Sequence, residues 1–222
     1  MRAYVSLWSA DLLEVGQSIE AVGDAADGFH IDVMDGHFVP ELLFGADFVS
    51  AVCRRTAQPV EVHLMVDEAD RWIERFAKTG CAWIAIHLAS SENAEVSLRE
   101  IERHGARPVI TLTLAESPED VEPYLELVDR VLVMGTERAV KGVAAPDIRT
   151  YGQVAELVRL RNSSTRRPEV IVDGGIRRES VPLLAEAGAD GVIPGSLVLG
   201  SPEPVSVLAW IHEIDSTMAA DP

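Results

Sequence analysis

A stretch near residue 30 places two chemically active side chains at the end of an apolar run. The two are His30 and Asp32, which stand two positions apart. Side chains with this spacing in an extended strand project from the same face of a sheet. The imidazole and the carboxylate are therefore expected to point together, and together they provide half of a metal site.

Two similar polar residues follow apolar runs later in the chain, His63 within 62–65 and Asp173 within 172–175. The resulting set of two imidazoles and two carboxylates suits a divalent transition metal. Zinc is the first candidate, and iron, manganese and cobalt are compatible, because nitrogen and oxygen ligands without a thiolate do not select one metal. A single strand histidine is more often a hydrogen-bonded core residue. Four such side chains favour a shared site instead, since buried carboxylates without a cation are costly.

The rest of the chain alternates short apolar runs with longer amphipathic stretches, a pattern typical of strands followed by helices. Strands are predicted over residues 3–8, 28–34, 59–65, 82–88, 107–114, 130–134, 169–173 and 191–194. Helices are predicted over residues 11–24, 48–58, 67–78, 92–104, 117–127, 147–161 and 178–187, with a last helix after Pro204. Gly105 is expected to end the helix at 92–104, because glycine readily adopts the left-handed conformation found there.

Eight strand–helix units predict an α/β protein, a (β/α)8 TIM barrel that forms a single domain over residues 1–222. Parallel strands joined by right-handed helical crossovers close into such a barrel and bury both faces of the sheet. A doubly wound open sheet is the alternative. Closure is favoured because the polar residues, His87 among them, lie at the ends of different strands, and in a barrel those ends meet at one mouth.

The charge and composition argue against several classes of function. The net charge of −17 disfavours binding to nucleic acid or to an anionic membrane, since either partner requires a basic surface. Cys53 and Cys81 form no CxxC pair and are expected to be reduced and buried. The first residues lack the pattern of a signal peptide, and no apolar run has the length of a membrane span. A cytoplasmic protein is therefore expected.

Several motifs, in order along nearly the whole chain, resemble those of the ribulose-phosphate 3-epimerase family. The one at 30–40, His-Ile-Asp-Val-Met-Asp-Gly-His-Phe-Val-Pro, is long enough to be highly specific. The others are Ser-Leu-Trp-Ser-Ala-Asp at 6–11, Val-His-Leu-Met at 62–65, Val-Asp-Gly-Gly-Ile at 172–176 and Pro-Gly-Ser at 194–196. In that family a divalent metal is held by the residues that match His30, Asp32, His63 and Asp173. The two matching aspartates also serve as acid and base, and the resemblance implies the same roles here.

The resemblance implies a metal-dependent epimerase that inverts C3 of a ketose phosphate, such as D-ribulose 5-phosphate and D-xylulose 5-phosphate or a related tetrulose or hexulose phosphate. Removing the proton beside a ketose carbonyl creates an enediolate, whose negative charge a bound metal stabilises. Asp32 and Asp173 on opposite faces then remove and return a proton, and they exchange roles in the reverse direction. The alternatives are a non-catalytic barrel that binds a sugar phosphate and another isomerase or lyase on the same fold. The resemblance also implies a homo-oligomer.

Further positions match family residues around the substrate. Ser6 is expected to bind a hydroxyl group of the sugar, and His63 is expected to contact the substrate as well as the metal. Three methionines that end predicted strands match residues covering the reacting centre, where soft side chains exclude water, with core filling as the alternative: Met34, Met65 and Met134. Glycine turns after the last two predicted strands indicate a phosphate site, formed by Gly174, Gly175, Gly195 and Ser196.

The phosphate loop departs from the family pattern. After its sixth strand the family has a glycine-rich Asn-Pro-Gly-Phe-Gly-Gly-Gln stretch, whereas this chain has Gly-Thr-Glu-Arg-Ala-Val-Lys-Gly-Val at 135–143. Only Gly142 remains of the loop glycines. Arg138 and Lys141 are expected either to supply charge to the phosphate in compensation or to remain solvated.

Two other departures lie at the predicted mouth of the barrel. Glu41 stands where the family usually has asparagine, and Leu88 and Ala89 follow His87 where a glutamate is common. These changes alter the distal pocket rather than the metal centre. They allow a substrate other than D-ribulose 5-phosphate.

Overall fold

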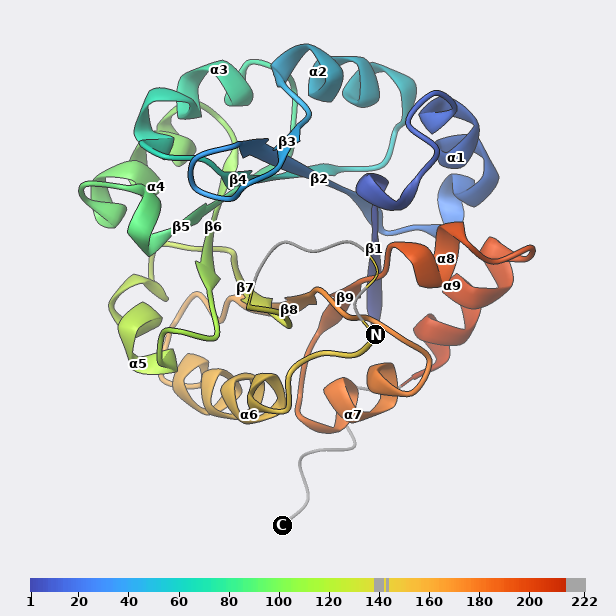
Figure 1. The fold of residues 1–222 in the computed structure, drawn as a ribbon. Helices are drawn as coiled ribbons and strands as arrows, with labels where there is room; N and C mark the ends of the chain where they lie inside the picture. Colours follow the sequence, from blue (N-terminus) through green and yellow to red (C-terminus); the bar gives the residue numbers. More distant parts are fainter. Residues whose placement is uncertain (138–141, 143, 215–222) are drawn as a thin grey trace.

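The computed structural model describes residues 1–137, 142 and 144–214. Within them, eight parallel strands form a closed ring that is surrounded by helices (Figure 1). The ring closes because β1 pairs in parallel with both β2 and β9. Its strands are β1 (Arg2–Ser6), β2 (Gly28–Asp35), β4 (Val60–Met65), β5 (Trp83–His87), β6 (Arg107–Leu112), β7 (Arg130–Met134), β8 (Glu169–Asp173) and β9 (Gly191–Ile193). The predicted TIM barrel is confirmed, and the open-sheet alternative is wrong.

Helices occupy the segments between the strands, and Figure 1 shows them packed around the outside of the ring. They are α1 (Val15–Val22), α2 (Ala46–Arg55), α3 (Ile73–Ala77), α4 (Ala94–Arg103), α5 (Pro118–Val121), α6 (Arg149–Arg161), α7 (Ser180–Glu186), α8 (Ser196–Leu199) and α9 (Pro204–Glu213). Short 3-10 turns lie at Leu7–Ser9, Gly23–Ala25, Ala69–Arg71, Leu88–Ser90 and Glu122–Tyr124. No helix of the described segments is long and apolar enough to cross a bilayer.

Helix α4 shows how the local sequence sets the ends of an element. Asn93 caps its beginning, since the side-chain oxygen accepts a hydrogen bond from the backbone N–H of Val96 at 3.2 Å. Leu98 and Ile101 lie three positions apart on its buried face. Gly105 follows the helix with a φ of 88°, a conformation that costs glycine little. The predicted stop at Gly105 is confirmed.

Some predicted helices are shorter than the amphipathic pattern indicates. The first begins at Val15, because Asp11 Oδ1 accepts a hydrogen bond from the backbone N–H of Leu13 at 3.0 Å and forms a turn there. The helix predicted over 117–127 divides into α5 and a 3-10 turn. Pro123 lies in that turn and has no N–H with which to continue the helical ladder.

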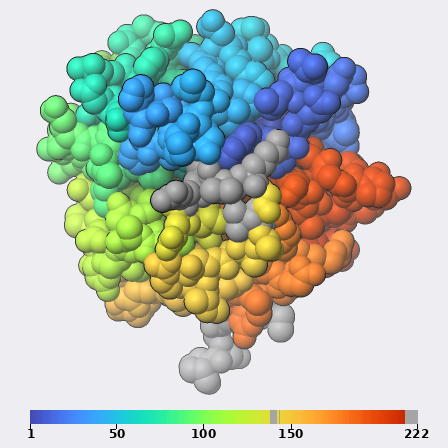
Figure 2. All heavy atoms as spheres, in the orientation of Figure 1, coloured from blue at the N-terminus to red at the C-terminus, as the bar shows by residue number. Residues whose placement is uncertain are grey.

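Two short elements were not expected from the sequence. β3 (Leu42–Leu43) pairs antiparallel with the end of β2, opposite Met34 and Asp35. Helix α8 follows β9 directly. Each is too short to produce a periodic pattern, so neither has a signal in the sequence. Figure 2 shows that the segment containing β3, in blue, and the beginning of α6, in yellow, both reach the face toward which the strands end.

Apolar side chains fill the N-terminal end of the barrel interior, which we call the floor. A cluster of buried side chains occupies this floor, composed of Tyr4, Trp83, Ala85, Val109, Leu132, Ile171 and Ile193. The main apolar core lies in the other layer, between the outer face of the sheet and the helices. Because the floor is packed, the polar side chains at the C-terminal strand ends gather above it, at the mouth.

Both cysteines are free thiols, as expected from their spacing. Cys81 is buried and Cys53 is half-buried. Burial raises the pKa of the Cys81 thiol to about 12, despite a hydrogen bond with Thr79. A thiol with so high a pKa is a poor nucleophile and a poor metal ligand at neutral pH.

Candidate metal and proton-transfer site

The structure brings His30, Asp32, His63 and Asp173 together at the mouth of the barrel. One nitrogen or oxygen atom from each lies within 4.8 Å of those from the other three, and we call this group the His/Asp cluster. His30 and Asp32 come from β2, and the register of the sheet places Asp32 opposite His63 on β4. Asp173 ends β8. The period of two along each strand directs all four side chains inward.

Each histidine nitrogen in the cluster faces an oxygen of both aspartates. His30 Nε2 lies 3.2 Å from Asp32 Oδ1 and 3.7 Å from Asp173 Oδ2. His63 Nδ1 lies 3.4 Å from Asp32 Oδ1 and 3.9 Å from Asp173 Oδ2, yet it is buried without a hydrogen-bond partner. A buried polar atom without a partner is costly, and a cation between these atoms would satisfy it. The donor set therefore fits a divalent metal.

The two aspartates have different proton affinities. Burial would raise the pKa of Asp32, but the neighbouring imidazoles of His30 and His63 lower it strongly. Burial and the nearby charge of Asp32 raise the pKa of Asp173 to about 6, although His30 opposes this. Burial would lower the pKa of His30, and Asp32 and Glu61 instead raise it well above its usual range. Two carboxyl groups whose pKa values differ in this way can serve as an acid and a base.

The apparent metal affinity is expected to fall as the pH is lowered through about 6, because Asp173 has a pKa of about 6. Below that pH the Asp173 carboxyl holds a proton that an incoming metal must displace, and above it the carboxylate is free to bind. His30, whose pKa lies well above its usual range, adds a second proton that the metal must displace on both sides of that pH. Each displaced proton weakens the apparent affinity by about tenfold per pH unit. Zinc competition titrations from about pH 5 to about pH 8 measure this effect. An affinity that stays constant across the interval would contradict it.

His30 is held from below by a buried carboxylate. Its Nδ1–H donates to Glu61 Oε1 at 3.0 Å, which leaves Nε2 to face the cluster. Glu61 is 1% exposed, and burial raises its pKa less than His30 and Arg130 lower it, so the pKa is about 2. A carboxylate behind a ligating histidine fixes the imidazole tautomer and its orientation. Glu61 was not identified from the sequence, although a charged residue two positions before His63 within an apolar strand is a signal for it.

Arg130 in turn holds Glu61 beneath the cluster. Its guanidinium donates to Glu61 Oε2 at 3.0 Å and to Glu169 Oε2 at 2.8 Å. It also stacks between aromatic rings, 4.2 Å from the centroid of Tyr4 and 3.7 Å from that of Trp83. Arg130 is 1% exposed, so a full positive charge lies inside the barrel. This residue also escaped the sequence analysis, because its partners lie on other strands.

His63 is supported on its outer side by His87. The two Nε2 atoms lie 2.9 Å apart, and His87 is 3% exposed. If His63 Nδ1 binds a metal, its Nε2 carries the proton and donates it to His87. Burial and the neighbouring His63 lower the pKa of His87 well below its usual value, so His87 remains the neutral acceptor in this bond.

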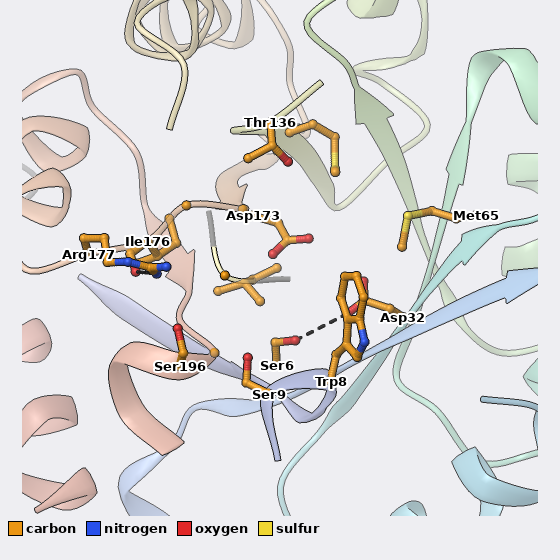
Figure 3. Close-up of a pocket in the computed structure, with 16 residues that line it drawn as sticks. Ser6, Trp8, Ser9, Asp32, Met65, Thr136, Asp173, Ile176, Arg177 and Ser196 are labelled. Atoms are coloured by element: carbon orange, nitrogen blue, oxygen red, sulfur yellow. Dashed lines mark hydrogen bonds between the residues drawn. The ribbon is translucent and has the colours of Figure 1, made fainter. Parts of the chain in front are cut away.

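A hollow of about 70 Å³ lies above the His/Asp cluster, and we call it the central hollow (Figure 3). Asp32 and Asp173 line it. So do most of the residues that were predicted to contact the substrate, namely Ser6, Met65, Met134, Gly142, Gly174, Gly175, Gly195 and Ser196. Ser6 Oγ donates to Asp32 Oδ2 at 3.3 Å, as the dashed line marks. Met34 and His63 do not line the hollow, and Met34 packs instead with Met65 and Trp8 in a separate apolar cluster. Arg138 and Lys141 lie outside the described residues.

The glycines at one side of the hollow are required by close approaches of the chain. Gly174 and Gly175 have φ values of 95° and 70°, which glycine adopts at little cost. A Cβ on Gly175 would lie 2.5 Å from the backbone of Ala145, and one on Gly195 would clash with Ser9. Only glycine fits at these positions, so no side chain covers the backbone that lines the hollow there. An anion-binding site needs such an uncovered backbone.

Arg177 lines the same side of the hollow and was not identified from the sequence. Figure 3 shows Arg177 and Ser196 on one side, Met65 on the other, and Asp173 with Asp32 between them. The guanidinium donates to the backbone oxygen of Ile176 at 2.7 Å. A basic residue directly after the Asp-Gly-Gly-Ile motif was the available signal for this position.

The chain is similar in sequence to a family of sugar-phosphate epimerases. The model of the ribulose-phosphate 3-epimerase family matches residues 3–199, a span that includes the whole His/Asp cluster. The chain belongs to the ribulose-phosphate 3-epimerase family. The ribulose-phosphate 3-epimerase of Bacillus subtilis (strain 168) is 32% identical over 215 residues, covering 93% of this chain and 96% of the relative. That of Helicobacter pylori (strain J99) is 31% identical and covers 99% of this chain and 100% of the relative.

Solved structures with lower identity share the barrel. KGPDC from Streptococcus mutans superposes with a TM-score of 0.72 at 14% identity, covering 96% of this chain and 98% of that one. The 3-hexulose-6-phosphate synthase from Salmonella typhimurium gives a TM-score of 0.67 at 18% identity, covering 99% and 98%. At these identities the likeness establishes the fold, while the family model establishes the kind of enzyme.

Proposed function

We propose that this epimerase-family chain inverts C3 of a ketose phosphate and depends on a divalent metal, with D-ribulose 5-phosphate and D-xylulose 5-phosphate as the first pair to test. One observation carries the proposal. Asp32 and Asp173 come from β2 and β8, which are separated in the ring by β1 and β9, and they face the same point together with one nitrogen each from His30 and His63. The relatives named ribulose-phosphate 3-epimerase support this choice of substrate.

The two aspartates transfer the proton. The ionised carboxylate removes the C3 proton from one face of the sugar, and the protonated carboxyl supplies a proton to the other face. A divalent metal held by the four residues of the His/Asp cluster supplies positive charge where the substrate oxygens become negative. Ser6 holds Asp32 through its hydroxyl. Met65 and Met134 cover the centre with soft apolar groups that exclude water.

The phosphate is proposed to lie on the side of the hollow formed by Gly174, Gly175, Gly195 and Ser196. Glycine turns of this kind offer backbone N–H groups to an anion. Arg177 adds a positive charge beside them, and it replaces part of the binding that the lost loop glycines provide in the family. Arg138 and Lys141 remain candidates for the same role.

Arg177→Met is expected to raise KM for a ketose phosphate by about 10-fold to 100-fold, because a charge-assisted hydrogen bond contributes roughly 1.5–3 kcal/mol. The catalytic constant should change much less, since the bond is made equally in the ground state and the transition state. Arg178→Met is the matched control, because Arg178 stacks on Trp210 at 4.4 Å and does not line the hollow. Equal effects of the two variants on KM would overturn the role of Arg177.

The proposed reaction is tested in deuterated water. The protein is incubated with D-ribulose 5-phosphate and with D-xylulose 5-phosphate, with zinc, manganese, cobalt or iron(II) supplied in excess, and deuterium at C3 is followed by NMR. We expect exchange and interconversion with at least one metal and none after chelation. Tight binding of the sugar phosphate without exchange under any metal would refute the epimerase and favour a non-catalytic binding barrel.

Three finer expectations accompany the proposal. Zinc is the proposed metal among those that the donor set accepts, and metal analysis of the purified protein tests it. A homo-oligomer is proposed from the family, and sedimentation measures it. A cytoplasmic location is proposed because the family members act on metabolites, and cell fractionation tests it.

A further inference from the structure

A second cavity adjoins the central hollow, and we call it the annex. Its walls come from Phe38–Pro40 after β2, from Ala89 after β5, from Thr113–Glu116 after β6, and from the ends of β4 and β7. We propose that the annex holds an uncharged apolar group attached to C1 of the substrate, so that the preferred substrate is a C1-substituted ketose phosphate. This inference rests on the proposed epimerase function.

The annex adjoins the central hollow and has a much larger volume. Met65, Met134 and Thr136 line both cavities. The annex encloses about 590 Å³, compared with about 70 Å³ for the hollow. Pockets that take drug-sized ligands enclose roughly 300–1,000 Å³. The terminal CH2OH of an unsubstituted ketose occupies only a small part of such a volume.

The chemistry of the walls selects an apolar and uncharged group. Phe38–Pro40, Leu114 and the two methionines give a largely apolar lining. The charged side chains that the structure describes in the annex already form hydrogen bonds within the protein. The carboxylate of Glu116 accepts hydrogen bonds from the backbone N–H and the hydroxyl of Thr113, both at 2.8 Å.

The basic side chain of the annex is also paired. Arg149 donates to Glu137 at 2.7 Å and to Asp147 at 2.9 Å. A guanidinium already bonded to two carboxylates is a weak site for a second phosphate. The annex therefore fits a hydrocarbon or aromatic substituent better than another anionic group.

The orientation of the substrate follows from the arrangement in Figure 3. Arg177 and Ser196 lie on one side of the aspartates and Met65 on the other. A ketose 5-phosphate with its phosphate beside Ser196 and C3 between the aspartates directs C1 away from the phosphate, because the two groups are at opposite ends of the carbon chain. C1 then faces Met65, where the annex begins.

A departure from the family pattern occurs in the annex wall. Leu88 and Ala89 follow His87 where the family commonly has a glutamate, and Ala89 lines the annex. A carboxylate there would have to be desolvated beside an apolar group, which is costly. Its absence makes this wall compatible with the proposed substituent.

The test compares two compounds that share the reacting centre. They are D-ribulose 5-phosphate and 1-anilino-1-deoxy-D-ribulose 5-phosphate, and C3 deuterium exchange gives kcat/KM for each with saturating metal. We expect the anilino compound to be favoured by about tenfold or more, since filling an apolar pocket gives discrimination of that order. Ala89→Phe should lower the ratio of the two constants by about tenfold or more, because the new ring occupies the annex. Ala57→Phe is the matched control, since Ala57 is exposed in the turn before β4, at the opposite end of the barrel.

The outcomes separate this inference from the function on which it rests. If neither compound exchanges, the proposed epimerase fails and the inference fails with it. If D-ribulose 5-phosphate exchanges and the anilino compound is not preferred, the epimerase stands and the substrate inference is overturned. A preference that Ala89→Phe leaves unchanged, or that Ala57→Phe reduces equally, also overturns it. A preference that only Ala89→Phe removes supports it.

Discussion

Replacing Asp32 or Asp173 with asparagine is expected to slow epimerisation by about 10²-fold to 10⁴-fold, the usual contribution of a positioned acid or base. Asparagine has the same shape as aspartate but cannot carry the proton. If each carboxylate serves one face of the sugar, each variant should still exchange the C3 proton of one epimer slowly, while losing interconversion. Asp32→Asn and Asp173→Asn should then retain exchange with opposite epimers.

This result is measured by following solvent deuterium into both epimers separately, with metal in excess and bound metal quantified. The metal analysis matters because both aspartates also belong to the His/Asp cluster. Asp67→Asn is a suitable control, since Asp67 is an exposed residue just after β4 and takes no part in the cluster. Loss of exchange with the same epimer in both aspartate variants would contradict a mechanism with one base on each face.

Removing the buried charges beneath His30 is expected to have the second large effect. Glu61→Gln should weaken metal binding by about 10-fold to 100-fold, because the residue behind a ligating histidine sets its tautomer and orientation. Arg130→Met should destabilise the fold by about 3–5 kcal/mol, since it leaves Glu61 charged, buried and without its cation. The double variant should recover part of that stability, because the unpaired charge is gone, but none of the metal affinity.

Denaturant unfolding of the metal-free protein gives the stabilities, and competition with a chelator gives the metal affinities. The visible spectrum of the cobalt form reports the geometry at His30 independently of activity. Glu74→Gln serves as the control, since it removes one partner of an exposed ion pair with Lys78 at 2.7 Å and should alter neither quantity measurably. Unchanged metal affinity in Glu61→Gln would show that Glu61 only fills space.

Much of the fold was predictable from the sequence because the barrel repeats one local pattern. A buried parallel strand needs a short apolar run, and each crossover helix needs an amphipathic stretch. Both signals are local, so their order was readable without knowing the contacts. Element ends were less predictable, because they depend on single hydrogen bonds such as that between Asp11 and Leu13.

The His/Asp cluster was predictable for a related reason. His30 and Asp32 share a strand face through the period of two, while His63 lies near the end of β4 and Asp173 ends β8. Closure of the barrel then brings strand ends to one mouth, whatever side chains they carry. The family motifs supplied the expected reaction, and the family match confirms the kind of enzyme.

The surroundings of the cluster depended on contacts between distant segments. Arg130 reaches Glu61 across 69 positions of sequence, and no local pattern encodes such a pair. Met34 lies one residue before the end of β2 and packs away from the central hollow. The annex became visible only in three dimensions, because a cavity is defined by the distances between loops that follow different strands.

The sequence by itself therefore determined the barrel, the four side chains of the cluster and the expected chemistry at C3. Those features follow from periodicity within single strands and from the rule that parallel strand ends converge. The tertiary structure alone decided what supports His30, which side chains line the central hollow, and how much space lies beyond Met65. Each of these depends on packing between strands and loops that are far apart in the chain.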